Sequence, residues 1–251
     1  MPPLETRIHL NMLARSQRPG LRRRLQLARR ALLPEEGDAL EAEGLARRTR
    51  AALGALFGSR RLYGLEWGDP DEVAYLRHVR DHFLKPYVTP ATVVLEVGPG
   101  GGRWTRYMLG ARHLYLVDYH QELLDELARS FRGDTLTMIR NSGSDFPGVP
   151  PASVDFLFSF GCFVHLDSEI IDDYLRNMAG VLKPRAIVVL QYSDKTKELA
   201  RRIPGFADND PERMRQRIEA RGFTVYEEDT TSLPHSAVVR FGPAPADPAA
   251  R

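Results

Sequence analysis

Between residues 93 and 104 the sequence reads VVLEVGPGGGRW. The first five residues are apolar except for Glu96, which is typical of a strand covered on both faces. The strand runs into a turn with glycines at 98, 100 and 102, and glycine lets the backbone take a positive φ and come close to a ligand. The G-x-G-x-G spacing differs from the G-x-G-x-x-G of dinucleotide-binding turns. We therefore predict a ligand-binding turn after a buried strand, and not a dinucleotide site.

On the carboxyl side of this turn, short apolar runs alternate with helical patterns. They predict strands at 93–97, 114–117, 136–139, 154–158 and 187–192, and helices at 104–109, 121–131 and 168–182. A helix at 211–221 then precedes strands at 223–228 and 237–241, which we expect to form an antiparallel hairpin. The predicted fold is α/β, a Rossmann-like sheet that is mostly parallel, with an antiparallel last strand.

The chain before this region has a different pattern. Residues 1–66 carry leucines at helical spacing, so we predict a helical extension that forms a lid over the ligand site, a dimer contact, or both. The ligand-binding domain is predicted to span residues 67–242 and to open with a helix over 70–84 that Asp69 caps. Residues 243–251 show no pattern and are expected to be a disordered tail.

Composition excludes several classes of function. The 251 residues are 43% hydrophobic with a net charge of +2, which supports a folded core and gives no reason to expect a nucleic-acid partner. No apolar run approaches the roughly 18 residues of a membrane-spanning helix, and the N-terminus lacks a secretory signal. We therefore expect a cytoplasmic protein that does not bind membranes. The one cysteine, Cys162, excludes an internal disulfide and a cysteine-cluster metal site.

Two acidic residues complete the pattern around the glycines. Glu96 stands two positions before the first glycine, and the next strand ends in Asp118, an acceptor placed to hold ribose hydroxyls. This arrangement resembles the first two motifs of the class I S-adenosylmethionine-dependent methyltransferases, and the resemblance covers residues 89–242. It implies S-adenosylmethionine as cofactor, with its amino-acid portion at the glycine turn and its adenine at Asp145 and Phe146. The cofactor-binding residues that the resemblance implies are Glu96, Gly98, Gly100, Gly102, Trp104, Asp118, Tyr119, Ser144, Asp145, Phe146 and Ser159.

The loop after the fourth predicted strand, SFGCFVHLD at 159–167, carries the candidate general base. In the family's fold this loop lies under the reactive methyl group, and an imidazole is the side chain suited to general base catalysis near neutral pH, which makes His165 the candidate. The alternative is that His165 only orients the loop. A further histidine, His235, belongs either to the mouth of the same site or to the surface.

Asp194 follows the fifth predicted strand, at the edge of the sheet where open α/β folds bind ligands. It is a candidate to orient His165, to hold a substrate hydroxyl, or to bind Mg²⁺ together with Asp167. The other interpretation is a helix cap within a solvated loop.

The segments LEVGPGGGRWTRYML, FSFGCFVHLD and LQYSDKTKELARR resemble bacterial, actinobacterial-type sugar and small-molecule O-methyltransferases. The resemblance implies methyl transfer to a hydroxyl, with a saccharide as the expected acceptor. A homodimer is expected if residues 1–66 form a dimer contact. Two alternatives stay open. One is a cofactor-binding protein without turnover whose N-terminal helices serve a partner. The other is aminopropyl transfer on the same fold, although SFGCFVHLD lacks the Asp-rich pattern of the loop that holds a polyamine.

Overall fold

The protein is described by a computed structural model that covers Gly64 and residues 67–244. The predicted helical extension, apart from Gly64, and the tail from residue 245 lie outside the described residues. The chain divides into two compact units between Asp69 and Pro70, and every helix and strand of the described residues belongs to the second unit. Among these residues, none of the helices has the length and apolar character needed to cross a membrane.

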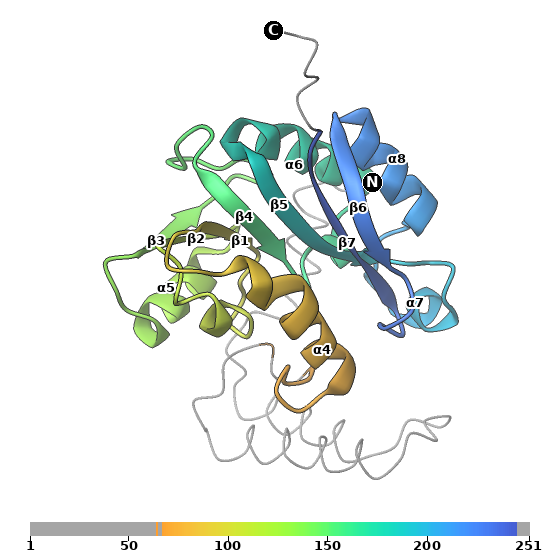
Figure 1. The fold of residues 1–251 in the computed structure, drawn as a ribbon. Helices are drawn as coiled ribbons and strands as arrows, with labels where there is room; N and C mark the ends of the chain where they lie inside the picture. Colours follow the sequence, from red (N-terminus) through yellow and green to blue (C-terminus); the bar gives the residue numbers. More distant parts are fainter. Residues whose placement is uncertain (1–63, 65–66, 245–251) are drawn as a thin grey trace, which may run out of the picture. The chain divides into compact units, whose positions relative to one another are not determined.

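One mixed sheet organises the described residues, with the strand order β3-β2-β1-β4-β5-β7-β6 (Figure 1). The strands are β1 Val93–Val97, β2 His113–Asp118, β3 Leu136–Arg140, β4 Val154–Ser159, β5 Leu182–Ser193, β6 Phe223–Asp229 and β7 Ser236–Pro243. Strands β1 to β5 pair in parallel, whereas β7 is antiparallel to both β5 and β6. The predicted Rossmann-like class is confirmed. The antiparallel last strand lies inside the sheet, between β5 and β6.

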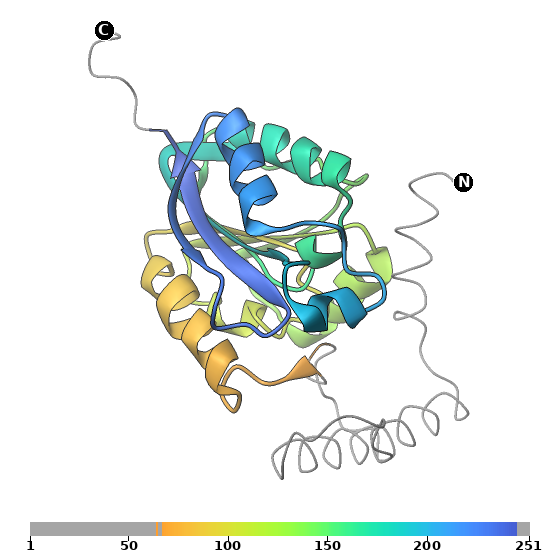
Figure 2. The ribbon, with the colours of Figure 1, turned by 90° about the vertical axis from the view of Figure 1, so that its right-hand side faces the viewer.

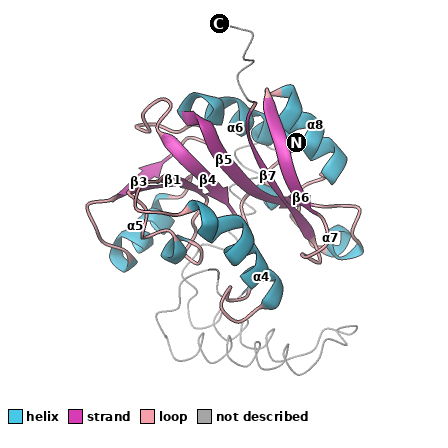
Figure 3. Ribbon diagram, viewed as in Figure 1, coloured by secondary structure: helices cyan, strands magenta, loops and turns pink. Residues whose placement is uncertain are grey.

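Helices cover both faces of this sheet (Figures 2 and 3). In Figure 2, α6 and α8 lie on one face and α4 lies on the other. The helices are α4 Ala74–His78, continued by a π-helix Val79–Leu84 and a 3₁₀-helix Lys85–Tyr87, then α5 Gln121–Ser130, α6 Ser168–Val181, α7 Glu198–Arg202 and α8 Pro211–Ala220. Helix α7 was not expected from the sequence.

The first described helix begins later than predicted. The prediction placed its start at Pro70, but α4 begins at Ala74. Arginine side chains take the carbonyl oxygens that an earlier start would need: Arg77 donates to Asp71 O at 2.7 Å and Arg80 to Pro70 O at 3.2 Å. The residues before Ala74 thus form a turn whose carbonyl oxygens are bonded by arginine side chains, and the helix begins after it.

The predicted helix at 104–109 is also wrong. Only a 3₁₀-helix, Thr105–Tyr107, forms there, held by bonds such as Tyr107 N to Trp104 O at 3.0 Å. The Thr105 hydroxyl donates to Glu96 at 2.6 Å, and the chain must reach β2 by His113. A short, tight helix meets both constraints where a longer α-helix would not.

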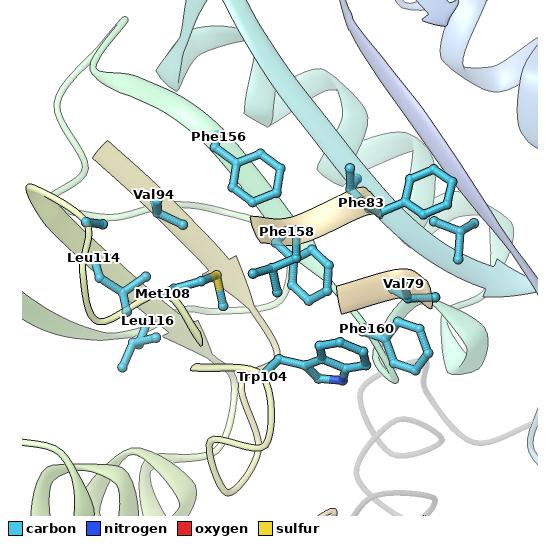
Figure 4. Close-up of a cluster of buried hydrophobic side chains, with 14 of the residues drawn as sticks. Val79, Phe83, Val94, Trp104, Met108, Leu114, Leu116, Phe156, Phe158 and Phe160 are labelled. Carbon is cyan, nitrogen blue, oxygen red and sulfur yellow. The ribbon is translucent and has the colours of Figure 1, made fainter. Parts of the chain in front are cut away.

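A buried cluster fills the space between α4, the π-helix and the sheet (Figure 4). Val79 and Phe83 of the π-helix are fully buried in it, and Phe158 of β4 packs beside them. This cluster fixes the face of the sheet next to the glycine turn.

Candidate functional site

The glycine turn after β1 has a backbone that other residues would strain. Gly98, Gly100 and Gly102 have φ angles of 69°, 55° and 88°. A Cβ at position 98 would lie 2.6 Å from the Cβ of Cys162, in the loop after β4. At position 102 it would overlap the ring of Phe131, just past α5. The turn is therefore held tightly between two neighbouring segments, with its backbone at the carboxyl edge of the sheet.

Glu96 lies beneath this turn and is 2% exposed. The pKa of its carboxyl is raised to about 8: burial is the largest cause and the charge of Asp118 acts in the same direction, while the hydrogen bond from Thr105 and the charge of Arg103 oppose them. A buried carboxyl of this kind favours a cationic partner, because a nearby positive charge stabilises its ionised form. An ammonium group such as that of S-adenosylmethionine meets this requirement.

Asp118 ends β2 beside the same turn, and 3% of its surface is exposed. Gly98 N donates to Val117 O at 2.8 Å, which ties the turn to the end of β2. One carboxylate oxygen, Oδ1, accepts from His120 N at 2.9 Å. The structure thus brings Glu96, the glycine turn and Asp118 together, as predicted for a cofactor site. Tyr119 follows, half-buried, with its ring 5.3 Å from that of His120.

The segment after β3 is held by hydrogen bonds of its own. Asp145 Oδ1 accepts from the amide and the hydroxyl of Ser142 at 2.7 and 2.9 Å. Ser144 is fixed by Asn177 of α6, which donates to its carbonyl oxygen at 2.9 Å. Phe146 is 8% exposed and packs 5.9 Å from the ring of Tyr174. The segment predicted to contact adenine is thus a loop at the carboxyl end of β3 that these hydrogen bonds order.

Asn141, directly after β3, was missed by the sequence interpretation. It is 3% exposed, and its Nδ2 donates to the hydroxyl of Tyr174 at 2.9 Å. Its Oδ1 is buried without a hydrogen-bond partner among the described residues. A buried acceptor of this kind is costly unless something donates to it. The available signal was a polar residue directly after a strand, one position beyond the residue that pairs with Asp118 in β2.

Two of the predicted cofactor residues are used within the fold. Trp104 is 2% exposed in the buried cluster, with ring centroids 5.4 Å from Phe158 and 4.6 Å from Phe160 (Figure 4). Ser159 is fully buried, and its hydroxyl donates to Val97 O at 2.8 Å. Both side chains fix the ends of strands that carry the site.

His165 lies in a 3₁₀-helix, Phe163–His165, in the loop after β4. Its Nδ1 is 2.9 Å from Gly205 O, and because a carbonyl only accepts, Nδ1 carries the hydrogen. In the neutral ring, the lone pair is therefore on Nε2. The ring also contacts Phe206 edge-on, with centroids 5.4 Å apart. The imidazole is held in the tautomer that a general base at Nε2 requires.

Asp194 faces its own loop. Its Oδ1 accepts from the amide and hydroxyl of Thr196 at 3.1 and 2.6 Å, and Oδ2 is 3.7 Å from the ammonium of Lys197. The group that orients His165 is Gly205 O, so the prediction that Asp194 does so is wrong. Asp194 instead joins the end of β5 to the start of α7.

The predicted Mg²⁺ site does not fit these residues. Asp167 is the N-cap residue of α6 and accepts from Ile170 N and Ile171 N through its backbone oxygen. The Asp194 carboxylate is already paired with a lysine. Across the described part of the chain, no group of three or more His, Cys, Asp or Glu side chains is arranged to hold a metal ion.

Residues 94–185 match the family described as a methyltransferase domain. This part of the chain is therefore similar to methyltransferase domains, and its sheet has the Rossmann-like strand order of the class I S-adenosylmethionine-dependent methyltransferase fold. The match begins in β1 and ends in β5, so it includes the glycine turn, Asp118 and His165 of this methyltransferase domain. No curated protein sequence matches the chain.

Solved structures share the fold of the methyltransferase domain. A methyltransferase dependent on S-adenosylmethionine, from Aquifex aeolicus, matches with a TM-score of 0.52 and 19% identity over 68% of this chain and 90% of its own. A glycopeptide N-methyltransferase matches with a TM-score of 0.51 and 15% identity, over 62% and 83%. A [4+2]-cyclase matches with a TM-score of 0.58 and 15% identity, over 68% and 82%. At these identities the likeness concerns the fold alone.

Proposed function

We propose that this methyltransferase domain methylates a hydroxyl of a small molecule, with a sugar or glycan as the acceptor and His165 as the general base. The observation that carries the proposal is the hydrogen bond from His165 Nδ1 to Gly205 O at 2.9 Å. It leaves the lone pair of the neutral imidazole on Nε2, the atom that would take the hydroxyl proton.

The residues of the chain divide the work. Glu96 would neutralise the ammonium group of S-adenosylmethionine, and Asp118 would accept hydrogen bonds from its ribose. When bound, this cofactor supplies a methyl group on a sulfonium sulfur, and the acceptor oxygen takes the methyl as the carbon–sulfur bond breaks. His165 removes the hydroxyl proton at Nε2, and Gly205 O stabilises the imidazolium that results.

A polar acceptor suits the residues at the ends of β5 and β7. Gln191, Ser193 and Ser236 are each at most 2% exposed and lie on one face of the sheet. Such buried polar groups favour a ligand rich in oxygen over a flat aromatic one. The loop SFGCFV lacks the Asn-Pro-Pro-Tyr pattern of amide and nucleobase N-methylation.

Calorimetry with S-adenosylmethionine tests the cofactor site first. We expect binding by the full chain and at least a tenfold loss in Asp118→Ala, the scale of losing hydrogen bonds to a charged group. Asp125→Ala, on the exposed side of α5, is the matched control and should bind as the wild type does. No binding by the wild type would overturn the proposal.

Transfer of a labelled methyl group to a panel of saccharides, amines and polyamines tests the reaction. We expect product with saccharides, lost by about 10²–10⁴-fold in His165→Gln, and no effect of a chelator. Product only with amines would place this domain nearer to N-methylation. Binding without transfer, and indifference to His165→Gln, would support the cofactor-binding alternative. Transfer of an aminopropyl group to a polyamine would support the alternative that the protein is an aminopropyltransferase.

A further inference from the structure

A chain of hydrogen bonds links the loop after β4 to β5 and to the start of β7. Gln191 of β5 accepts from Gly161 N, in the loop after β4, at 2.8 Å, and donates through Nε2 to the hydroxyl of Ser236 at 2.7 Å. The same hydroxyl is 3.0 Å from Nδ1 of His235. The relay therefore links the loop that leads to His165 with the residue that precedes β7.

The direction of each bond can be assigned. The Gly161 amide can only donate, so Oε1 of Gln191 faces it and the amide nitrogen faces Ser236. Ser236 Oγ thus accepts from Gln191. Ser193 lies opposite Ser236 in the register, but its hydroxyl forms no hydrogen bond within the described residues. The Ser236 hydroxyl hydrogen therefore points to Nδ1 of His235, which accepts it.

His235 is consequently neutral with its hydrogen on Nε2. Partial burial and the positive charges of Lys197 and Arg103 together lower the pKa of this imidazole to about 4. Lys197 donates to Leu233 O at 2.7 Å and to Ser236 O at 2.8 Å, so its charge is fixed beside the loop that carries His235. Within the described part of the chain, Nε2–H of His235 donates no hydrogen bond, so it is available to donate one to a ligand.

The imidazoles of His165 and His235 pack against the same aromatic ring and carry their hydrogens on different ring nitrogens. His165 and His235 contact Phe206 edge-on, with centroids 5.4 and 5.5 Å from that ring. His165 carries its hydrogen on Nδ1 and His235 on Nε2. One ring is thus arranged to accept a proton at Nε2, and the other to donate a hydrogen bond from Nε2.

We infer that the acceptor carries two oxygens, one that loses its proton to His165 and a second that accepts a hydrogen bond from Nε2 of His235. His235 is then a substrate-binding residue that selects polyols over compounds with a single hydroxyl. The inference rests on the proposed function, because it assigns a second contact to the acceptor of that reaction. The hydrogen bonds from Gln191 to Ser236 and from Ser236 to His235 fix the tautomer of His235.

The test compares cyclohexane-1,2-diol with cyclohexanol, which differ by one hydroxyl. Binding of each probe to the full chain, saturated with S-adenosylhomocysteine, is followed through the ring signals of ¹⁵N-labelled histidines. We expect the wild type to bind the diol about tenfold more tightly, the scale of one neutral hydrogen bond. The ratio should fall to about one in His235→Phe, which keeps a ring against Phe206, and return in part in His235→Gln, which restores an N–H donor.

His113→Gln is the matched control, because His113 begins β2 at the opposite edge of the sheet, and its ratio should equal that of the wild type. A wild-type ratio near one, including failure of both probes to bind, would overturn the inference. So would a preference for the diol that survives in His235→Phe, or a ring spectrum in which His235 carries its hydrogen on Nδ1.

The two proposals fail separately. Binding is measured without transfer, so the preference for the diol can hold in a protein that methylates neither probe, and then only the proposed reaction is wrong. Conversely, transfer that depends on His165 but shows no difference between diol and alcohol removes the role of His235 and leaves the proposed reaction in place.

Discussion

Gly98 connects β1 to the glycine turn and has a φ of 69°. A Cβ added at this position would lie 2.6 Å from the Cβ of Cys162. We predict that Gly98→Ala lowers the free energy of unfolding by about 2–3 kcal/mol, from backbone strain and overpacking together. Gly180→Ala is the control, because position 180 is an exposed helical site with open space around it. It should raise the free energy of unfolding by about 0.5–1 kcal/mol. Urea unfolding measures both, and equal effects would contradict the prediction.

At the scale of residues, the sequence predicted the proximity of Glu96, the glycine turn and Asp118 better than the contacts between β5 and β7. Glu96, the glycines and Asp118 are close in sequence, so their spacing reports their proximity. Gln191 and Ser236 are distant in the chain and meet only because β5 and β7 pair. Their residue types carry no signal by themselves, since glutamine and serine are common in solvated loops.

At the scale of elements, uniform apolar runs predicted the strands well, and boundaries failed where polar residues are paired inside the fold. Strand β5 starts at Leu182 rather than 187, because Lys183 within it pairs with Asp155 of β4 at 2.7 Å. The sequence Lys183-Pro184-Arg185 reads as a loop when this partner is unknown. The late start of α4 has the same origin, in side chains that capture backbone oxygens.

Helix α8 tests how far local capping fixes an element. The Asp210 side chain accepts from Arg213 N at 2.9 Å, and Pro211 occupies the first helical position. We predict that Asp210→Ala lowers the free energy of unfolding by about 1 kcal/mol, as the loss of an N-cap does. Asp208→Ala, which removes only an exposed ion pair to Arg213, should change it by less than about 0.5 kcal/mol. Comparable losses in both variants would show that charge, and not the cap, stabilises α8.

Lys197 joins the start of α7 to the loop between β6 and β7. Because its positive charge disfavours the imidazolium of His235, we predict that Lys197→Met raises the pKa of His235 above its value of about 4. Histidine ring signals followed by NMR through a pH titration measure the change. Lys195→Met, whose ammonium bonds to Ala200 O instead, should leave the titration unchanged. A pKa that is unchanged or lower in Lys197→Met would refute the prediction.

At the scale of the whole molecule, Glu96 makes stability depend on pH. Its pKa is 4.5 as a free side chain and about 8 when folded, so between these values the folded state holds a proton that the unfolded state has lost. This group therefore contributes a loss of stability as pH rises from about 4.5 to about 8, and no further loss above that.

We predict that Glu96→Gln, which keeps an oxygen for Thr105 and removes the ionisation, gains stability relative to the wild type across this pH range. Thermal unfolding of the two proteins without cofactor, at a series of pH values, measures the difference. A difference that stays constant between pH 5 and pH 8 would show that Glu96 is ionised in the folded protein.

The position of β7 between β5 and β6 has a consequence for how the protein is made. During synthesis, β6 leaves the ribosome before β7, yet within the described sheet β7 is its only neighbour. A growing chain therefore holds β6 without a partner until residues 236–243 emerge, a period in which chaperones can bind it. The strand that then inserts also places Ser236 beside Gln191. Pairing of β7 therefore completes the sheet and forms the Gln191–Ser236 hydrogen bond in the same step.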